Sequence, residues 1–362
     1  MTQPIHGGNV YKFAREQRIP VGRILDFSAS INPLGPPATG LRAIRAALKQ
    51  IVHYPDPDCW QLKQKLAQRC AVDPEMILVG NGSTELIHLL PRALTIASTL
   101  VLGPTFEEYA HALTEAGSSV QYVHATHEEK FRPPLHETVR QLSDTRSRFD
   151  AVYLCHPNNP TGQVLNRLAM RELAEAAARR RSWLIVDEAF IDYCPAQSVM
   201  PMLHEYPHMI VLRSLTKFYA MPGLRIGYLV GASKVVELVK DRQSPWSVNS
   251  LAQEVSLAVL GDHAYAAKSR IYMKSERSRF MRGLRSLPGL KVYPSAANFV
   301  LLGLPATTTA AEVTDRLAVE RILVRDCSTM PGLTSQMIRV AVKTEKDNRR
   351  LLAVLSSCLR KP

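Results

Sequence analysis

The sequence predicts an α/β protein with a large domain built on a mostly parallel sheet and a smaller α/β domain at the C-terminus. Short β-branched runs alternate with helix-period segments over residues 41–248, which is typical of βαβ units. These runs are apolar almost throughout, as in strands that are buried on both faces. The pattern changes after residue 248, and 362 residues exceed the usual size of one core.

The strands of the large domain are expected where β-branched and apolar residues cluster. Helix-period segments separate most of these runs, for example the segment 166–181, whose apolar residues recur on one helical face. Helices are therefore expected on both faces of the sheet. The predicted strands are 76–80, 98–103, 119–125, 150–156, 182–188, 209–214 and 225–231.

The C-terminal part begins with a long helical stretch, roughly 250–286, which leads to an apolar segment at 290–304. A helix, the short run 321–327, a strand at 335–342 and a closing helix follow. The Pro-rich segment 27–40 is loop-like. We therefore expect an N-terminal arm that packs on the small domain, a large domain and a small domain, with the boundaries 1–40, 41–248 and 249–362.

Composition narrows the class of protein. The start of the chain lacks the apolar core of a signal peptide, and no apolar run is long enough to span a bilayer. Six cysteines without C-x-x-C spacing disfavour zinc and disulfide frameworks and favour a reducing cytoplasm. The net charge of +13 is spread over the chain without interleaved aromatics, which favours a small anionic substrate over nucleic acid.

The string GNGSTE follows a predicted strand and opens a helix at about Ser83. Free backbone N–H groups at a helix N-terminus bind phosphate well, and the hydroxyls of Ser83 and Thr84 would add to them. An ordinary N-cap explains the same residues, because Ser is a preferred cap.

The string HPNNPTG forms a turn-rich loop after another predicted strand. Loops at the carboxyl ends of parallel strands build the binding sites of α/β sheets, so Asn158 or Asn159 could donate to a ligand oxygen. His156 is interpreted as a residue behind the site, because no second His or Cys lies at metal-ligand spacing.

Two charged residues follow strongly apolar strands. Asp187 ends the run at 182–188 and is either a helix N-cap or the partner of a cation such as a protonated pyridine. Lys217 follows the run at 209–214, and Arg225 comes eight residues later. A surface lysine is the ordinary alternative, but a partly desolvated amine can act as a nucleophile and form a Schiff base.

The strings GNGSTE, HPNNPTG, DEAFIDY and SLTKFYAMPGLRIGY, in this order and spacing, resemble the fold-type I pyridoxal phosphate enzymes. The resemblance covers almost the whole chain and implies an aspartate aminotransferase-like fold. Within that fold type the chain is similar to the histidinol-phosphate aminotransferase branch. The strings HGGN and LDFSASINPLG, together with Phe190 where those aminotransferases usually carry Tyr, resemble the threonine-phosphate decarboxylases in particular.

The resemblance implies a role for each matching residue. Lys217 would hold the cofactor as a Schiff base, Asp187 would pair with its pyridine nitrogen, and Tyr109 would stack on its ring. Tyr54 would act from the neighbouring subunit of a homodimer. The implied cofactor-binding residues are Gly82, Ser83, Thr84, Tyr109, Asn158, Asp187, Ser214, Thr216, Lys217, Arg225 and Tyr54. The implied substrate-binding residues are His6, Gly7, Asn32, Asn158, Arg325 and Arg339.

The resemblance also implies a reaction, the pyridoxal phosphate-dependent decarboxylation of L-threonine O-3-phosphate to (R)-1-aminopropan-2-ol O-phosphate in cobalamin biosynthesis. Lys217, Asp187 and Tyr109 would be the catalytic residues, and Lys217 or a nearby acid would reprotonate Cα. A histidinol-phosphate-type aminotransferase, a serine-phosphate decarboxylase and a non-catalytic binding protein are the alternatives. The sequence leaves open which of Arg325 and Arg339 binds carboxylate and which binds phosphate.

Overall fold

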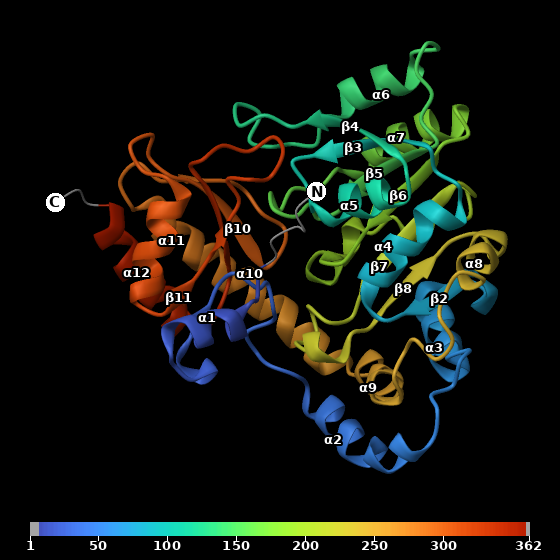
Figure 1. The fold of residues 1–362 in the computed structure, drawn as a ribbon, viewed down its shortest axis with the longest axis horizontal. Helices are drawn as coiled ribbons and strands as arrows, with labels where there is room; N and C mark the ends of the chain where they lie inside the picture. Colours follow the sequence, from blue (N-terminus) through green and yellow to red (C-terminus); the bar gives the residue numbers. More distant parts are fainter. Residues whose placement is uncertain (1–6, 360–362) are drawn as a thin grey trace.

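The computed structural model describes residues 7–359, in which a large sheet flanked by helices lies beside a smaller sheet (Figure 1). The seven strands of the large sheet have the order β2-β8-β7-β6-β5-β3-β4. All neighbouring pairs are parallel except those that involve β8, which runs antiparallel to β2 and β7. The predicted strands are confirmed as β2 Ile77–Gly80, β3 Ser98–Gly103, β4 Ser119–His124, β5 Ala151–Cys155, β6 Trp183–Asp187, β7 Met209–Ser214 and β8 Gly227–Val230.

Helices cover both faces of this sheet, because its strands are apolar on both faces. In β5 the side chains of Val152 and Leu154 enter one buried cluster, and those of Ala151 and Tyr153 enter another. Helices α4 (Gly82–Ala93), α5 (Glu108–Glu115) and α8 (Ser233–Lys240) pack on the second cluster. Helices α3 (Trp60–Cys70), α6 (Leu135–Ser143) and α7 (Arg167–Arg179) pack on the first.

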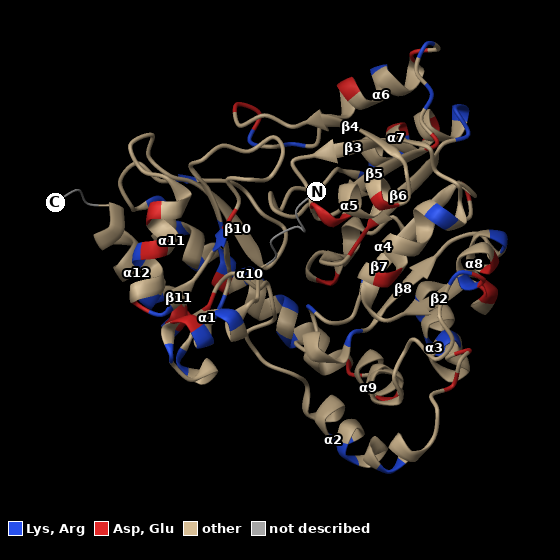
Figure 2. Cartoon of the chain, in the orientation of Figure 1, with Lys and Arg blue, Asp and Glu red and all other residues tan. Residues whose placement is uncertain are grey.

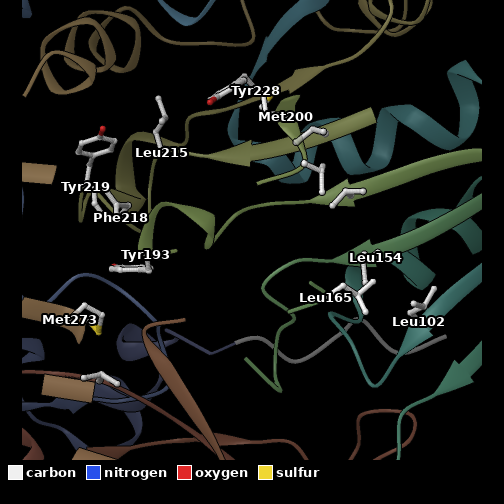
Figure 3. Close-up of a cluster of buried hydrophobic side chains, with 14 of the residues drawn as sticks. Leu102, Leu154, Leu165, Tyr193, Met200, Leu215, Phe218, Tyr219, Tyr228 and Met273 are labelled. Atoms are coloured by element: carbon white, nitrogen blue, oxygen red, sulfur yellow. The ribbon is translucent and has the colours of Figure 1, made fainter. Parts of the chain in front are cut away.

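The first cluster also reaches beyond the sheet. Figure 3 shows Leu102 and Leu154 from the strands in one cluster with Phe218, which follows β7, and with Met273 of helix α10. The segment that contains Lys217 therefore lies against the core that joins the two parts of the molecule.

The small domain contains a four-stranded antiparallel sheet with the order β12-β13-β10-β9. The helical stretch expected at 250–286 is two helices, because Gly261 ends the first and the Asp262 side chain caps the second by accepting from the backbone N of Tyr265. The elements are α9 Ser250–Leu260, α10 His263–Arg285, β9 Lys291–Val292, β10 Phe299–Gly303, α11 Ala310–Val319, β11 Ile322–Leu323, β12 Arg325–Asp326, β13 Met337–Ala341 and α12 Glu345–Leu359.

The N-terminal segment crosses between the two parts. After helix α1 (Val10–Gln17), strand β1 (Leu25–Asp26) pairs in parallel with β11 of the small domain. Helix α2 (Ala38–Ala47) then packs on α9, which in turn packs on α3 of the large domain. In Figure 1 the blue α1 lies beside the orange and red small domain. The domain boundaries at 40 and 248 stay predictions.

Within the described residues, no helix is both long and apolar enough to cross a membrane. Figure 2 shows basic and acidic residues interspersed over both parts of the molecule, without one continuous basic face in this view.

Candidate active site

The carboxyl ends of the parallel strands and the small-domain sheet enclose a cavity of about 430 Å³. Parallel sheets place the ends of separate strands at one edge, which brings residues far apart in sequence together. The predicted site residues that line the cavity are Gly7, Gly82, Ser83, Thr84, Tyr109, Asp187, Ser214, Thr216, Lys217, Arg225, Arg325 and Arg339.

Lys217 is partly buried in this lining, just after β7. Burial lowers the pKa of its ammonium to about 8, and the charges of Arg225 and Arg339 act in the same direction while Asp187 opposes them. Because removal of the proton frees the amine, this shift makes Lys217 easier to deprotonate than an ordinary lysine.

Asp187 ends β6 and is buried. One carboxylate oxygen accepts from the Tyr109 hydroxyl at 2.7 Å and the other from the backbone N of Ala189 at 2.9 Å. Burial raises the pKa of Asp187, while these two hydrogen bonds and the charge of Lys217 act against the rise. A buried carboxylate of this kind is stabilised by a cation beside it.

The N-terminus of α4 forms the third part of the site. Gly82 has φ +78°, and a Cβ there would lie 2.6 Å from Nη2 of Arg225, so only glycine allows this close approach. A Cβ at Gly227 would collide with the backbone N of Ser83 in the same way. The Ser214 and Thr216 hydroxyls bind each other at 2.9 Å. Free N–H groups, hydroxyls and one guanidinium therefore surround a space suited to a phosphate.

The amide in the cavity is Asn159 rather than Asn158. The Asn158 side chain donates to the Pro104 carbonyl at 2.8 Å and to the Thr161 hydroxyl at 2.9 Å, and it accepts from the Thr105 hydroxyl at 2.9 Å. Its hydrogen-bonding groups are thus used to shape the loop. Asn159 lines the cavity, and its side-chain oxygen accepts from Arg339. Successive side chains of the loop point in different directions, and for this reason Asn159 faces the cavity and Asn158 does not.

The two predicted arginines face each other on neighbouring strands, Arg325 on β12 and Arg339 on β13. Nη1 of Arg339 donates to Asn159 and Nη2 to the Ser28 carbonyl at 2.6 Å, while its buried Nε has no hydrogen-bond partner within residues 7–359. Burial lowers the pKa of Arg339 to about 10, and Arg325 adds to this effect. Arg325 donates through Nη2 to Glu107 at 2.9 Å.

Two further predicted residues, Asn32 and Tyr54, also do not line the cavity. The Asn32 amide donates to the Phe218 carbonyl at 2.8 Å and to Ser269 at 2.9 Å, and the backbone N of Asn32 donates to the Lys217 carbonyl. Asn32 therefore supports the lysine segment from behind instead of facing the cavity. Tyr54 is 80% exposed and stacks on Trp246, and His6 lies outside the described residues.

Sequence reasoning missed several residues of the lining. Glu108 lines the cavity and contacts Nε2 of His88 at 2.7 Å, and Ser28 and Ser30 of the N-terminal segment also face it. Acidic residues in the first turn of a helix are ordinary, so nothing in the sequence distinguishes Glu107 or Glu108. In the described part of the chain, no group of three or more His, Cys, Asp or Glu side chains is placed to hold a metal.

Known proteins resemble this chain in sequence and in fold. Residues 23–355 match the family model described as aminotransferase class I and II. The threonine-phosphate decarboxylase of Salmonella typhimurium is 38% identical over 356 residues, which cover 98% of this chain and 96% of that protein. The histidinol-phosphate aminotransferase of Clostridium acetobutylicum superposes with a TM-score of 0.86 at 30% identity, covering 92% of this chain and 98% of that one. The L-threonine-O-3-phosphate decarboxylase of Porphyromonas gingivalis superposes with a TM-score of 0.82 at 28% identity, covering 93% and 100%.

Proposed function

Because the chain belongs to the aminotransferase class I and II family, we propose that it is a pyridoxal phosphate-dependent decarboxylase of L-threonine O-3-phosphate that acts in cobalamin biosynthesis. The observation that carries the cofactor assignment is one cavity that holds Lys217, Asp187 and the N-terminus of α4 together. The similarity to threonine-phosphate decarboxylase at 38% identity favours this substrate over the others.

The residues of the cavity fit pyridoxal phosphate. Lys217, with a pKa of about 8, would bind the aldehyde, and Asp187 would keep a proton on the pyridine nitrogen. Tyr109, which already contacts Asp187, would lie at the ring, and Asn159, rather than Asn158, would donate to a cofactor oxygen. The phosphate would be bound by Gly82, Ser83, Thr84, Ser214, Thr216 and Arg225. When bound, the cofactor supplies an electron sink for the electron pair released at Cα.

The substrate carries two anionic ends, and the cavity offers two guanidinium groups for them. We assign the carboxylate to Arg339, because its Nε is buried without a partner in the described residues and a guanidinium fork matches a carboxylate. We assign the phosphate to Arg325 on the neighbouring strand. Gly7 lines the cavity and lies so close to Ser28 that a Cβ would collide with the Ser28 carbonyl, and we assign it to the substrate end.

The chain's own groups then perform the rest of the reaction. Arg339 orients the carboxylate that leaves, while Phe106, Phe190 and Met330 make part of the lining of the same cavity apolar. An apolar environment favours conversion of a charged carboxylate to neutral CO₂. The bond from Cα to the carboxylate breaks as CO₂ leaves, and the electron pair released at Cα later forms the new bond from Cα to a proton. Lys217 then donates a proton to Cα, which its pKa of about 8 allows near neutral pH.

Transamination of histidinol phosphate is the second candidate, and the superposition on the Clostridium acetobutylicum enzyme favours it specifically. It uses the same lysine, aspartate and phosphate site but breaks the Cα–H bond. Decarboxylation of serine phosphate is a close variant, since one methyl group discriminates by only about 1–3 kcal/mol. A non-catalytic binding protein has no use for a lysine of lowered pKa in the cavity.

One assay separates these candidates. The purified protein is incubated with pyridoxal phosphate and O-phospho-L-threonine in the absence of any keto acid, and CO₂ release is followed. Turnover there, with a lower kcat/KM for O-phospho-L-serine, supports the proposal. Turnover only with histidinol phosphate plus 2-oxoglutarate would replace it by the aminotransferase, and no turnover with either pair would favour the binding protein.

A further inference from the structure

We propose that Glu107 occupies Arg325 in place of the substrate's phosphate, so that every anion that binds Arg325 must first displace this carboxylate. The proposal rests on the proposed function in one respect, the assignment of the substrate's phosphate to Arg325. It adds a residue that lies beside the cavity and sets the affinity of the site without taking part in bond breaking.

The Glu107–Arg325 ion pair joins the two parts of the molecule. Glu107 immediately precedes α5 of the large domain, and Arg325 lies on β12 of the small domain. Oε2 of Glu107 and Nη2 of Arg325 are 2.9 Å apart. The Arg325 side chain is 6% exposed and the Glu107 side chain 18%. Glu107 is thus the partner closer to water, which makes it the one that can leave the pair.

The arrangement of charges explains why a carboxylate is held there. Arg325 and Arg339 are register partners on adjacent strands, and like charges directly opposite each other destabilise a sheet. Arg339 donates to an amide oxygen and a carbonyl, and no carboxylate within the described ranges forms an ion pair with it. Without Glu107, Arg325 would be a buried guanidinium with no ion-pair partner among residues 7–359 and with a second buried guanidinium opposite it, which is costly.

The pair and a bound substrate are therefore alternatives. Arg325 lines the cavity, and Glu107 holds its Nη2 atom, so a phosphate can bind Nη2 only when Glu107 turns away from it. The measured affinity for an anion is then its intrinsic affinity reduced by the population of the Glu107 pair. The same reduction applies to substrate and to free phosphate. The affinity of a ligand that does not contact Arg325 is not reduced.

The test is Glu107→Gln, which keeps the shape of the side chain and removes its charge. Binding is followed by the absorbance change of the bound cofactor, with O-phospho-L-threonine, inorganic phosphate and L-threonine as ligands. Phosphothreonine and inorganic phosphate are expected to bind roughly fivefold more tightly or better, by the same factor, with kcat nearly unchanged. L-Threonine, which lacks the phosphate, should bind as to the wild type. Glu129→Gln, an exposed carboxylate of the same region, is the control for net charge.

A structural role for Glu107 would produce the opposite sign, since loss of an orienting partner weakens binding. Unchanged or weaker binding of phosphothreonine and inorganic phosphate in Glu107→Gln therefore overturns the proposal. A double variant tests whether the effect passes through Arg325. With Arg325→Gln in place, Glu107→Gln should alter phosphate binding by less than about twofold. If Glu107→Gln still tightens phosphate binding about fivefold in that background, the proposal is wrong. These titrations need no turnover. A protein that releases no CO₂ would therefore contradict the decarboxylase assignment without contradicting this inference.

Discussion

The two ends of the cavity are built differently. At the large-domain end, Lys217, Asp187 and the residues around Ser83 follow strands or begin a helix of one continuous sheet, whose strands are buried on both faces. At the small-domain end, Arg325 and Arg339 lie on short antiparallel strands and depend on residues from distant segments, namely Asn159, Ser28 and Glu107. The groups proposed for chemistry thus lie along the edge of one extended sheet, and those proposed for recognition contact segments that are distant in sequence.

This difference predicts that changes at the large-domain end lower kcat, whereas replacement of an arginine at the small-domain end raises KM. The largest effect is expected for Lys217→Ala, which should reduce decarboxylation by roughly a thousandfold or more and abolish the Schiff-base absorbance. Steady-state kinetics and absorbance spectra measure both. Lys234→Ala, an exposed lysine on α8, should behave as the wild type. A Lys217→Ala variant that keeps both turnover and absorbance would contradict the cofactor assignment.

A smaller effect, of a different kind, is expected at the other end. Arg339→Lys replaces the guanidinium fork by a single ammonium, so KM for O-phospho-L-threonine should rise roughly 10–100-fold while kcat falls less. Arg148→Lys, at a site where the side chain is 87% exposed, provides the matched control. If Arg339→Lys lowers kcat and leaves KM unchanged, the assignment of recognition to the small-domain end is wrong.

The site is also expected to draw on a second subunit. Tyr54→Phe should weaken cofactor binding roughly tenfold, because a hydrogen bond to a charged phosphate is lost. Hybrid dimers of Tyr54→Phe and Lys217→Ala subunits locate the residue. If Tyr54 acts across the dimer, each hybrid holds one intact site with wild-type cofactor affinity. If every lysine-containing site of the hybrids binds the cofactor weakly, Tyr54 acts within its own subunit. If the protein sediments as a monomer, Tyr54 cannot act across a dimer.

The smallest expected effect is on stability. The pKa of Lys217 is about 8 in the folded protein against an ordinary value of 10.5. Between these values the unfolded chain binds more protons, so this lysine makes stability rise with pH. Cofactor-free Lys217→Met should therefore melt a few degrees above the wild type at pH 7, and the difference should shrink between pH 8 and 10.5. Thermal unfolding across that range checks it, and a difference independent of pH would refute the lowered pKa.

Much of the large domain was predictable because buried parallel strands are apolar runs that stand out in the sequence. The cofactor half of the site was predictable for the same reason, since its residues follow those runs directly. Helices α1 and α2 were not predicted, because Pro and Gly around them indicate loops. The roles of Asn158 and Asn159 depend on which way each side chain points, which composition does not encode.

The substrate half was less accessible to sequence reasoning. The Glu107–Arg325 pair joins residues 218 positions apart, and nothing in either local pattern indicates the other. The cytoplasmic location, the homodimer and the domain boundaries stay predictions of the sequence.

The N-terminal segment binds both halves of the molecule. Leu25–Asp26 pairs with Ile322–Leu323, and the Asn298 amide donates to the Ser30 carbonyl. Two residues further on, Asn32 holds the segment of Lys217. The two domains are consequently not exchangeable modules. A chimaera that takes its small domain from a relative would lose matched contacts at one end of this segment, wherever the junction is placed. Substitutions in the N-terminal segment and in both domains are therefore expected to be coupled.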